Sequence, residues 1–218
     1  MTEQQIFNFD SASNFLEEDF IKDISNRDVM NFLKKFPNWE NKLINIVGEK
    51  KSGKTFILQI FKNKNQFLYI SNATEFKKKY DKLFDADKLI LDSFEIDEER
   101  FFSLINNFIL HKKYLIISST EPLTRAKIKL QDLSSRFKQF FLLEIKNPSD
   151  ELIYSLILKY FSDNQIIIKK DLIDYIVKKI DRSYSKINKF LLKLNDLSVI
   201  KKKKIDYKLI NEVLNEMV

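Results

Sequence analysis

The run Gly48-Glu-Lys-Lys-Ser-Gly53-Lys54-Thr55 follows the apolar stretch Leu43–Val47, and it holds both glycines of the 218-residue chain. The spacing G-x-x-x-x-G-K-T is typical of a phosphate-binding loop, or P-loop, in which backbone N–H groups surround phosphate oxygens. Glycine lets the backbone approach the ligand where a Cβ atom would collide with it. Because glycine is so scarce here, a chance match to this pattern would be rare. The sequence therefore predicts a nucleotide-binding protein.

Each residue type in this loop has a role in holding a nucleotide. Lys54 is expected to reach the β- and γ-phosphates, and Thr55 to offer its hydroxyl to Mg²⁺. The apolar run that starts at Phe56 predicts a helix whose positive N-terminal end faces the anion. The expected cofactors are ADP or ATP with Mg²⁺. The residues of this region predicted to bind the nucleotide are Gly48, Lys50, Lys51, Ser52, Gly53, Lys54, Thr55 and Phe56.

Composition limits the class of protein. A hydrophobic content of 44% and an aromatic content of 13% can form a substantial core. There is no cysteine, the polar start MTEQQ lacks the order of a signal peptide, and the apolar runs are far shorter than the roughly 20 residues of a membrane helix. A cytoplasmic protein with no membrane contact is expected. The one histidine, His111, has no second ligand nearby and is assigned no metal.

The net charge of +7 is spread along the chain. Lysines alternate with Asp, Glu and Asn, which is typical of a solvated surface. The run Lys201–Lys204 lies between two amphipathic segments, and a nucleic-acid patch there stays open. We favour a lysine-rich turn between helices, because no aromatic platform or zinc-finger spacing accompanies the run.

Apolar runs bounded by polar turns alternate with helical periodicity as far as about Pro148, which is typical of an α/β domain. Five strands separated by helices predict a parallel sheet flanked by helices. The predicted strands are 43–47, 67–70, 89–91, 114–118 and 140–145. The predicted helices between them lie near 54–62, 74–80, 98–110 and 125–136.

After Pro148 the pattern is helical throughout, with helices predicted at 149–161, 170–180, 183–197 and 206–217. Ser149 and Asp206 are expected to cap the first and the last of them. The predicted divisions are an N-terminal peptide and linker (1–14), an α/β nucleotide-binding domain (15–148) and a small helical lid domain (149–218). This layout resembles that of the AAA+ P-loop ATPases.

Two further strand ends carry polar residues. The strand Lys88–Leu91 ends in Asp92, the place where a P-loop fold puts the Walker B acid beside the magnesium ion. The strand at 114–118 leads into Ser118, Ser119 and Thr120, any of which would suit the polar sensor that AAA+ proteins set between the P-loop and Walker B strands. A strand-end turn containing Pro122 is an equal alternative for each of the three.

Arg136 closes the short polar segment 132–136, just before the last predicted strand. AAA+ proteins use an arginine at this position as a finger. Its fixed charge and planar fork suit the γ-phosphate of a nucleotide held by a neighbouring subunit. An ordinary surface salt bridge is the alternative. We predict a catalytic role in trans.

Pieces spread over nearly the whole chain resemble the DnaA family of bacterial replication initiators, and most closely its shortened, Hda-like members. These pieces are 19–27, 36–39, the P-loop, 91–95, 133–136 and 181–184. The chain stops at Val218, after the lid, where DnaA continues into a DNA-reading domain, and we expect that domain to be missing. By the same resemblance, Ile21 and Ser25 would lie near the adenine base. A lid residue, either Arg182 or Asn188, would act as a sensor at the phosphates.

Hda-like proteins begin with a peptide that docks on the DNA polymerase sliding clamp, and the segment Gln4–Phe9 resembles it. Its register begins at Gln4 or Gln5, and the residues expected to bind the clamp are Gln4, Ile6, Phe7 and Phe9. The resemblance implies a regulator that prompts ATP hydrolysis by DnaA, with contact to DNA mostly through the clamp. Self-association into a homo-oligomer stays open.

The residue after Asp92 bears on the chain's own activity. Active AAA+ ATPases place a second acid there, whereas this chain has Ser93, with Glu95 two positions further on. Slow intrinsic hydrolysis is therefore expected. Two alternatives remain beside the Hda-like regulator. One is an autonomous ATPase of the helicase-loader type that uses Glu95 or another acid, and the other is a DNA-binding replication accessory protein.

Overall fold

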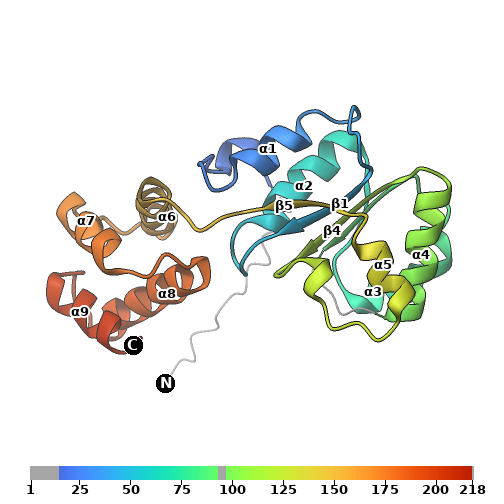
Figure 1. Ribbon diagram of the computed structural model, residues 1–218. Coiled ribbons are helices and arrows are strands. Elements are labelled where there is room, and N and C mark those ends of the chain that lie inside the picture. The colour runs from blue at the N-terminus through green and yellow to red at the C-terminus, as the bar shows by residue number, and fades with distance from the viewer. Residues whose placement is uncertain (1–14, 93–96, 218) are drawn as a thin grey trace, which may run out of the picture.

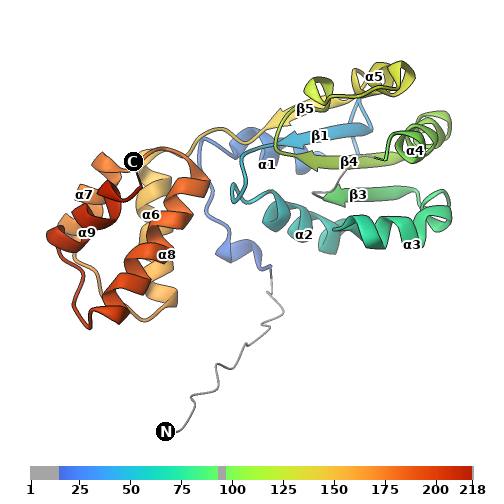
Figure 2. The same ribbon diagram turned by 90° about the horizontal axis from the view of Figure 1, so that it is seen from below.

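The computed structural model describes residues 15–92 and 97–217. Its centre is a parallel sheet of five strands in the order β2-β3-β4-β1-β5. The predicted α/β architecture is confirmed. Helices lie on both faces of the sheet, and the carboxyl ends of the strands point toward the helices of the C-terminal part (Figures 1 and 2). The strands are β1 (Leu43–Val47), β2 (Leu68–Ile70), β3 (Lys88–Asp92), β4 (Tyr114–Ser119) and β5 (Phe141–Glu144).

Helices connect the strands, and two of them start at side-chain caps. The side chain of Asn72 accepts a hydrogen bond from the backbone N–H of Glu75, and that of Asp97 accepts one from Arg100, so each satisfies a free donor of a first helical turn. The elements of the N-terminal part are η1 (Glu17–Asp19), α1 (Arg27–Leu33), α2 (Lys54–Asn65), α3 (Ala73–Leu83), α4 (Glu98–Leu110), η2 (Leu123–Arg125) and α5 (Gln131–Phe137).

Alternation along the buried strands divides the core of this part in two, because successive side chains of a strand point to opposite faces. On one face, Leu91 and Ile117 join the cluster formed by α3, α4 and α5. On the other face, Ile46 and Ile90 join the cluster formed by α1 and α2. With both faces covered, the strands have the continuous apolar sequences typical of a parallel sheet.

The C-terminal helices gather at one end of the molecule (Figures 1 and 2). They are α6 (Asp150–Asp163), α7 (Lys170–Lys179), α8 (Tyr184–Ile200) and α9 (Tyr207–Asn215). Ser149 caps α6 and Asp206 caps α9, as predicted. These helices share a hydrophobic core of their own, which includes the fully buried Phe161 and Phe190. On this basis we propose that the lid is a separate folding unit beginning near Ser149.

The helix predicted at 125–136 is shorter in the structure. Residues Leu123–Arg125 form a 3-10 turn, and α5 begins only at Gln131. The Glu98 carboxylate accepts hydrogen bonds from the backbone N–H groups of Lys129 (3.1 Å) and Leu130 (2.7 Å). These tertiary contacts hold the preceding segment outside a helix, against its local preference. In the parts of the chain that the structure covers, no helix is long and apolar enough to cross a membrane.

Candidate nucleotide-binding site

The P-loop joins β1 to α2 at the carboxyl end of the sheet, and both glycines are needed there. Gly53 has a φ of 89°, a left-handed conformation that side chains rarely adopt. A Cβ atom on Gly48 would lie 2.7 Å from Ser52 Oγ and 3.1 Å from Ile145 Cβ, the latter in the segment after β5. The loop therefore packs against its own residues and the sheet edge so closely that only glycine fits.

Lys54 is the first residue of α2 and is only 6% exposed. Its Nζ donates hydrogen bonds to the carbonyl oxygens of Gly48 (2.6 Å) and Glu49 (2.9 Å). Burial lowers the pKa of Lys54, and the nearby Asp92 and Glu49 carboxylates partly offset that effect. The ammonium group is thus held inside the loop, where it would have to exchange a carbonyl for a phosphate oxygen.

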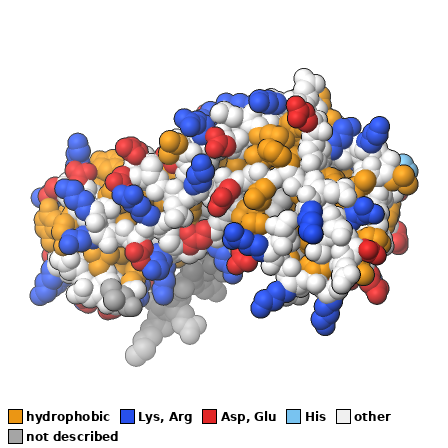
Figure 3. Space-filling view, viewed as in Figure 1, with side chains coloured by type: hydrophobic (Ala, Val, Ile, Leu, Met, Phe, Trp, Pro, Cys, Tyr) orange, Lys and Arg blue, Asp and Glu red, His pale blue; other side chains and the backbone are white. Residues whose placement is uncertain are grey.

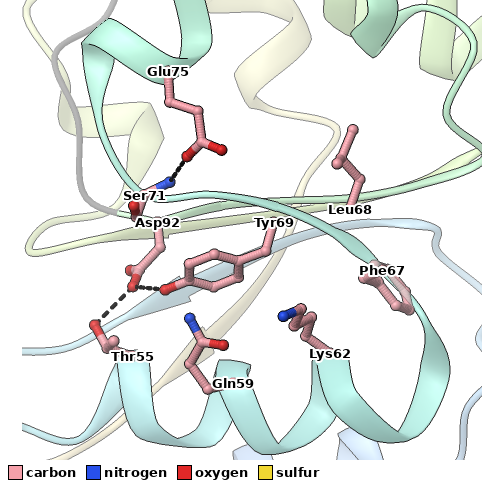
Figure 4. Close-up of a pocket in the computed structure, with 9 residues that line it drawn as sticks. All are labelled: Thr55, Gln59, Lys62, Phe67, Leu68, Tyr69, Ser71, Glu75 and Asp92. Carbon is pink, nitrogen blue, oxygen red and sulfur yellow. Dashed lines mark hydrogen bonds between the residues drawn. The ribbon is translucent and has the colours of Figure 1, made fainter. Parts of the chain in front are cut away.

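Asp92, at the end of β3, is 3% exposed and accepts hydrogen bonds from three hydroxyl groups. Thr55 Oγ1 lies 2.7 Å from its Oδ2, the Tyr69 hydroxyl lies 2.5 Å from the same oxygen (Figure 4), and Ser118 donates to its Oδ1. The predicted metal residues Thr55 and Asp92 are therefore in direct contact. Ser118, one of the three sensor candidates, is hydrogen-bonded to Asp92.

The other two sensor candidates lie near the same site. Ser119 accepts a hydrogen bond from Asn45 Nδ2 at 2.9 Å and donates one to the carbonyl of Glu121 at 2.6 Å, so its hydroxyl is occupied within the sheet end. Thr120 lines the main cavity together with Ser118 and Ser119. Ser118 and Ser119 end β4 and Thr120 follows it, and β4 pairs with both β1 and β3.

A cavity of about 1070 Å³ lies over the P-loop. It is lined by Phe15, Lys50, Lys51, Ser52, Gly53, Lys54, Thr55, Phe56, Ser118, Ser119 and Thr120. The Ser52 hydroxyl is buried and has no hydrogen-bond partner among the described residues. A buried hydroxyl without a partner costs stability, so a ligand with polar atoms would satisfy it. The P-loop residues predicted from the sequence, except Gly48 behind the loop, line this one cavity.

A smaller cavity of about 180 Å³ continues between the N-terminal segment, the P-loop and the lid. Ile21 and Ser52 both line it, together with Tyr184 of α8. Ser25 is buried beside it, and its hydroxyl is 3.0 Å from the Tyr184 hydroxyl. The structure thus brings Ile21 and Ser25, both predicted to lie near the base, close to the loop and the lid.

The residues at the end of β3 fit a magnesium site. Hard oxygen donors suit Mg²⁺, and P-loop proteins hold it with the loop Ser or Thr and the Walker B Asp. Thr55 and Asp92 meet that requirement, and their hydrogen bond fixes both side chains. Thr55 and Asp92 would hold Mg²⁺ there, and the ion would supply positive charge against the phosphates of a nucleotide.

Arg136 lies on α5, away from this cavity. Its side chain is half-buried, its Nε is buried without a hydrogen-bond partner, and it forms no ion pair within residues 15–92 and 97–217. It lines neither cavity at its own P-loop. Arg182 is exposed, and its Nη2 lies 2.9 Å from a carboxylate oxygen of Asp150 in the first turn of α6. It also lines neither cavity, and its sensor role stays a prediction, as does that of Asn188.

Other predicted residues cannot be placed. Gln4, Ile6, Phe7 and Phe9 of the clamp-binding segment lie outside the described residues, as do Ser93 and Glu95.

Among the residues of the site that were not predicted from the sequence, two make side-chain hydrogen bonds there. Tyr69 contacts Asp92 because β2 pairs with β3: Tyr69 is opposite Ile90, and Asp92, two residues further, shares the face of Ile90. Glu49 contacts the lid through Ser183 and Tyr184, 134 and 135 residues away. An apolar strand next to the Walker B strand was visible in the sequence, but the strand order that makes Tyr69 its neighbour was not.

Curated relatives of the chain include DnaA proteins of several bacteria, although no family model matches the chain. DnaA of Lachnoclostridium phytofermentans is 27% identical over 154 residues, which cover 68% of this chain and 33% of that protein. DnaA of Buchnera aphidicola subsp. Cinara cedri is 25% identical over 215 residues, covering 85% of this chain and 48% of that protein. The chain is a homologue of the AAA+ region of DnaA.

Solved structures agree on the AAA+ fold. Domain III of Thermotoga maritima DnaA has a TM-score of 0.72 at 16% identity, over 94% of this chain and 98% of that one. AMPPCP-bound DnaA from Aquifex aeolicus has a TM-score of 0.62 at 24% identity, over 83% of this chain and 64% of that one. The chain spans about a third of the Lachnoclostridium DnaA.

Proposed function

We propose that this DnaA-related AAA+ protein binds ADP or ATP with Mg²⁺ at the P-loop. Support comes from the glycine-only positions of the loop, the buried Lys54 ammonium and the Ser52 hydroxyl, which has no hydrogen-bond partner among the described residues. A phosphate group could approach the glycine backbone closely, supply negative charge to Lys54 and accept a hydrogen bond from Ser52. The base and ribose would occupy the smaller cavity near Ile21, under the first turn of α8.

We infer further that the chain acts as an Hda-like regulator, which presents Arg136 to ATP held by a partner DnaA and promotes its hydrolysis. The observation that carries this proposal is the state of Arg136. It is half-buried without an ion pair among the described residues, and it is remote from its own nucleotide cavity. A guanidinium held with no carboxylate partner is available to a phosphate of another subunit, where its planar fork is suited to developing charge.

The chain's own nucleotide would then serve mainly as a structural ligand, since binding to the folded state stabilises it. The sequence Asp92-Ser93 supports this division, because it lacks the second acid of active AAA+ ATPases. Recruitment to the sliding clamp would use Gln4, Ile6, Phe7 and Phe9, as apolar anchors after a glutamine. Contact with DNA would then run mainly through the clamp. The surface is consistent with that, because Lys and Arg side chains are scattered among Asp and Glu over the face seen in Figure 3.

The test mixes the purified chain, ADP and DNA-loaded clamp with ATP-charged DnaA, and follows phosphate release. The wild-type chain should accelerate it, and Arg136→Ala should lose most of the acceleration. Arg125→Ala removes an exposed arginine from the neighbouring turn and should keep it. Phosphate release by the chain alone, with no effect on DnaA, would favour the autonomous ATPase and make Glu95 the next residue to change. Tight, steeply salt-dependent DNA binding without the clamp would favour the DNA-binding accessory protein.

A further inference from the structure

Tyr69 lies beside Asp92, at a third cavity. This cavity of about 570 Å³ is lined by residues of α2, β2, α3 and β3 (Figure 4). The ring of Tyr69 lies over α2, beside Asp92, and its hydroxyl points at the carboxylate, 2.5 Å from Oδ2. Thr55 approaches the same oxygen from the start of α2, at 2.7 Å. Two hydroxyl donors thus converge on one carboxylate oxygen.

A carboxylate oxygen has about two lone-pair sites for hydrogen bonds. Oδ2 of Asp92 uses them for Thr55 and Tyr69, while Oδ1 accepts from Ser118. Mg²⁺ in proteins keeps several of its waters, and those waters need acceptors. At this acid, an additional donor to Oδ2 must therefore compete with one of the hydroxyls already bound.

The two hydroxyls differ in what they can do. Thr55 Oγ1 can donate to Asp92 and still offer a lone pair to the metal, so its bond is compatible with a loaded site. Tyr69 comes from a neighbouring strand and only occupies an acceptor site. The Tyr69 hydroxyl is directed at Asp92 Oδ2, and a phenol, with an ordinary pKa of about 10, is protonated and a donor at neutral pH.

We propose that Tyr69 is a positioning residue that holds the Asp92 carboxylate and weakens its engagement with Mg²⁺. This inference rests on the proposed nucleotide binding and deepens it: the chain would hold its nucleotide with little dependence on the metal. Such weak coupling suits a nucleotide that is a structural ligand rather than a substrate.

The test measures the Mg²⁺ dependence of ADP binding, with a fluorescent ADP analogue, for the wild-type chain and for Tyr69→Phe. Phe keeps the ring and removes only the hydroxyl. The concentration of Mg²⁺ needed for half of its effect on affinity should fall roughly three- to tenfold in the variant, the equivalent of losing one competing hydrogen bond. The affinity measured in EDTA should not change. Electron paramagnetic resonance of Mn²⁺, added in place of Mg²⁺, gives a second readout of metal bound per nucleotide complex.

Tyr80→Phe is the matched control. It removes a phenol whose hydroxyl donates to the Arg100 carbonyl at 3.0 Å, far along α3 from the metal-side acid, and should leave the Mg²⁺ dependence at the wild-type value. Asp92→Asn should abolish the metal dependence. An unchanged or weaker Mg²⁺ effect in Tyr69→Phe, with ADP still bound in EDTA, would overturn the inference and leave the proposed nucleotide binding intact. Failure of the wild-type chain to bind ADP at all would refute both.

Discussion

The Glu49 carboxylate, in the P-loop, accepts a hydrogen bond of 2.8 Å from the backbone N–H of Tyr184, the first residue of α8. It also accepts bonds from the Ser183 hydroxyl (2.5 Å) and the backbone N–H of Ser185 (3.3 Å). The side chain therefore caps a lid helix from another part of the fold and places a negative charge at its positive end. The Ser185 hydroxyl donates a further hydrogen bond to the carbonyl oxygen of Lys50 at 3.1 Å. The loop that would hold phosphates is thus bonded directly to the lid.

Replacing Glu49 should loosen the lid while leaving the sheet folded. Glu49→Gln keeps the size of the side chain but removes the charge, and the loss of a helix cap costs about 1 kcal/mol. Hydrogen exchange of the amides of Tyr184 and Ser185 should accelerate in the variant. The exposed Glu40 offers the control, since Glu40→Gln should leave these amides as they are. Equal protection of α8 in both variants would show that the cap does not hold the lid.

Low pH should weaken the contact between the P-loop and the lid. Partial burial acts to raise the pKa of Glu49, but hydrogen bonds from Ser183, Ser185 and Tyr184 outweigh it and leave that pKa below its ordinary value of 4.5. The pKa of Asp23 is lowered in the same way, with burial opposed by hydrogen bonds from Ser149 and Ser25. Groups with a lowered pKa in the folded state stabilise it above their unfolded pKa, and the stabilisation is lost as pH falls through the folded value.

The free energy of unfolding, measured by urea titration between pH 7 and about pH 3, should therefore fall mainly below the ordinary carboxyl pKa values. In Glu49→Gln the fall should be shallower, because one of the responsible carboxylates is gone. A pH profile of the variant that runs parallel to that of the wild type would contradict this assignment.

Lys54→Ala should abolish tight ADP and ATP binding, because the ammonium group is the cation that the loop holds at the cavity. Nucleotide added in excess should raise the melting temperature of the wild-type chain and not that of the variant, since a ligand of the folded state stabilises it by mass action. Lys64→Ala, at the exposed end of the same helix and outside the nucleotide cavities, is the comparison that should keep the nucleotide-induced shift. Equal shifts in both variants would mean that the nucleotide binds elsewhere.

A cavity in the hydrophobic core of the lid should destabilise the lid more than the sheet. Phe190 is fully buried among helices α6 to α9, and Phe→Ala changes of this kind cost about 3–5 kcal/mol. Phe190→Ala should unfold the lid at lower urea concentration than the sheet, seen as amide exchange that becomes fast in 150–217 and stays slow in β1 and β4. A single transition that takes both parts together would argue against a separate folding unit.

Local signals predicted most of this architecture, and long-range contacts account for what they missed. The strand Leu43–Val47 and the helix Glu98–Leu110 were predicted with the bounds that the structure has, because apolar periodicity and nearby caps determine both. Helix α5 was predicted to start too early, because Glu98 holds the preceding backbone from a distance of more than 30 residues along the chain.

The residues of the site likewise fall into those that local sequence predicts and those that it does not. Lys54, Thr55 and Asp92 belong to contiguous motifs whose spacing carries the chemistry, and the structure brings them together. Tyr69 and Glu49 have no motif of their own. Their roles come from the strand order and from the docking of the lid, neither of which is encoded in local sequence pattern.

The most direct test determines whether the ATP that is hydrolysed is bound to DnaA or to this chain. DnaA is preloaded with ATP labelled on its γ-phosphate, the chain is preloaded with unlabelled ADP, and release of labelled phosphate is followed in a single turnover with DNA-loaded clamp. Wild-type chain should accelerate release, Arg136→Ala should not, and Lys54→Ala should do so less well through loss of its own nucleotide. Equal acceleration by wild type and Arg136→Ala would contradict the assignment of Arg136 as the residue that acts in trans.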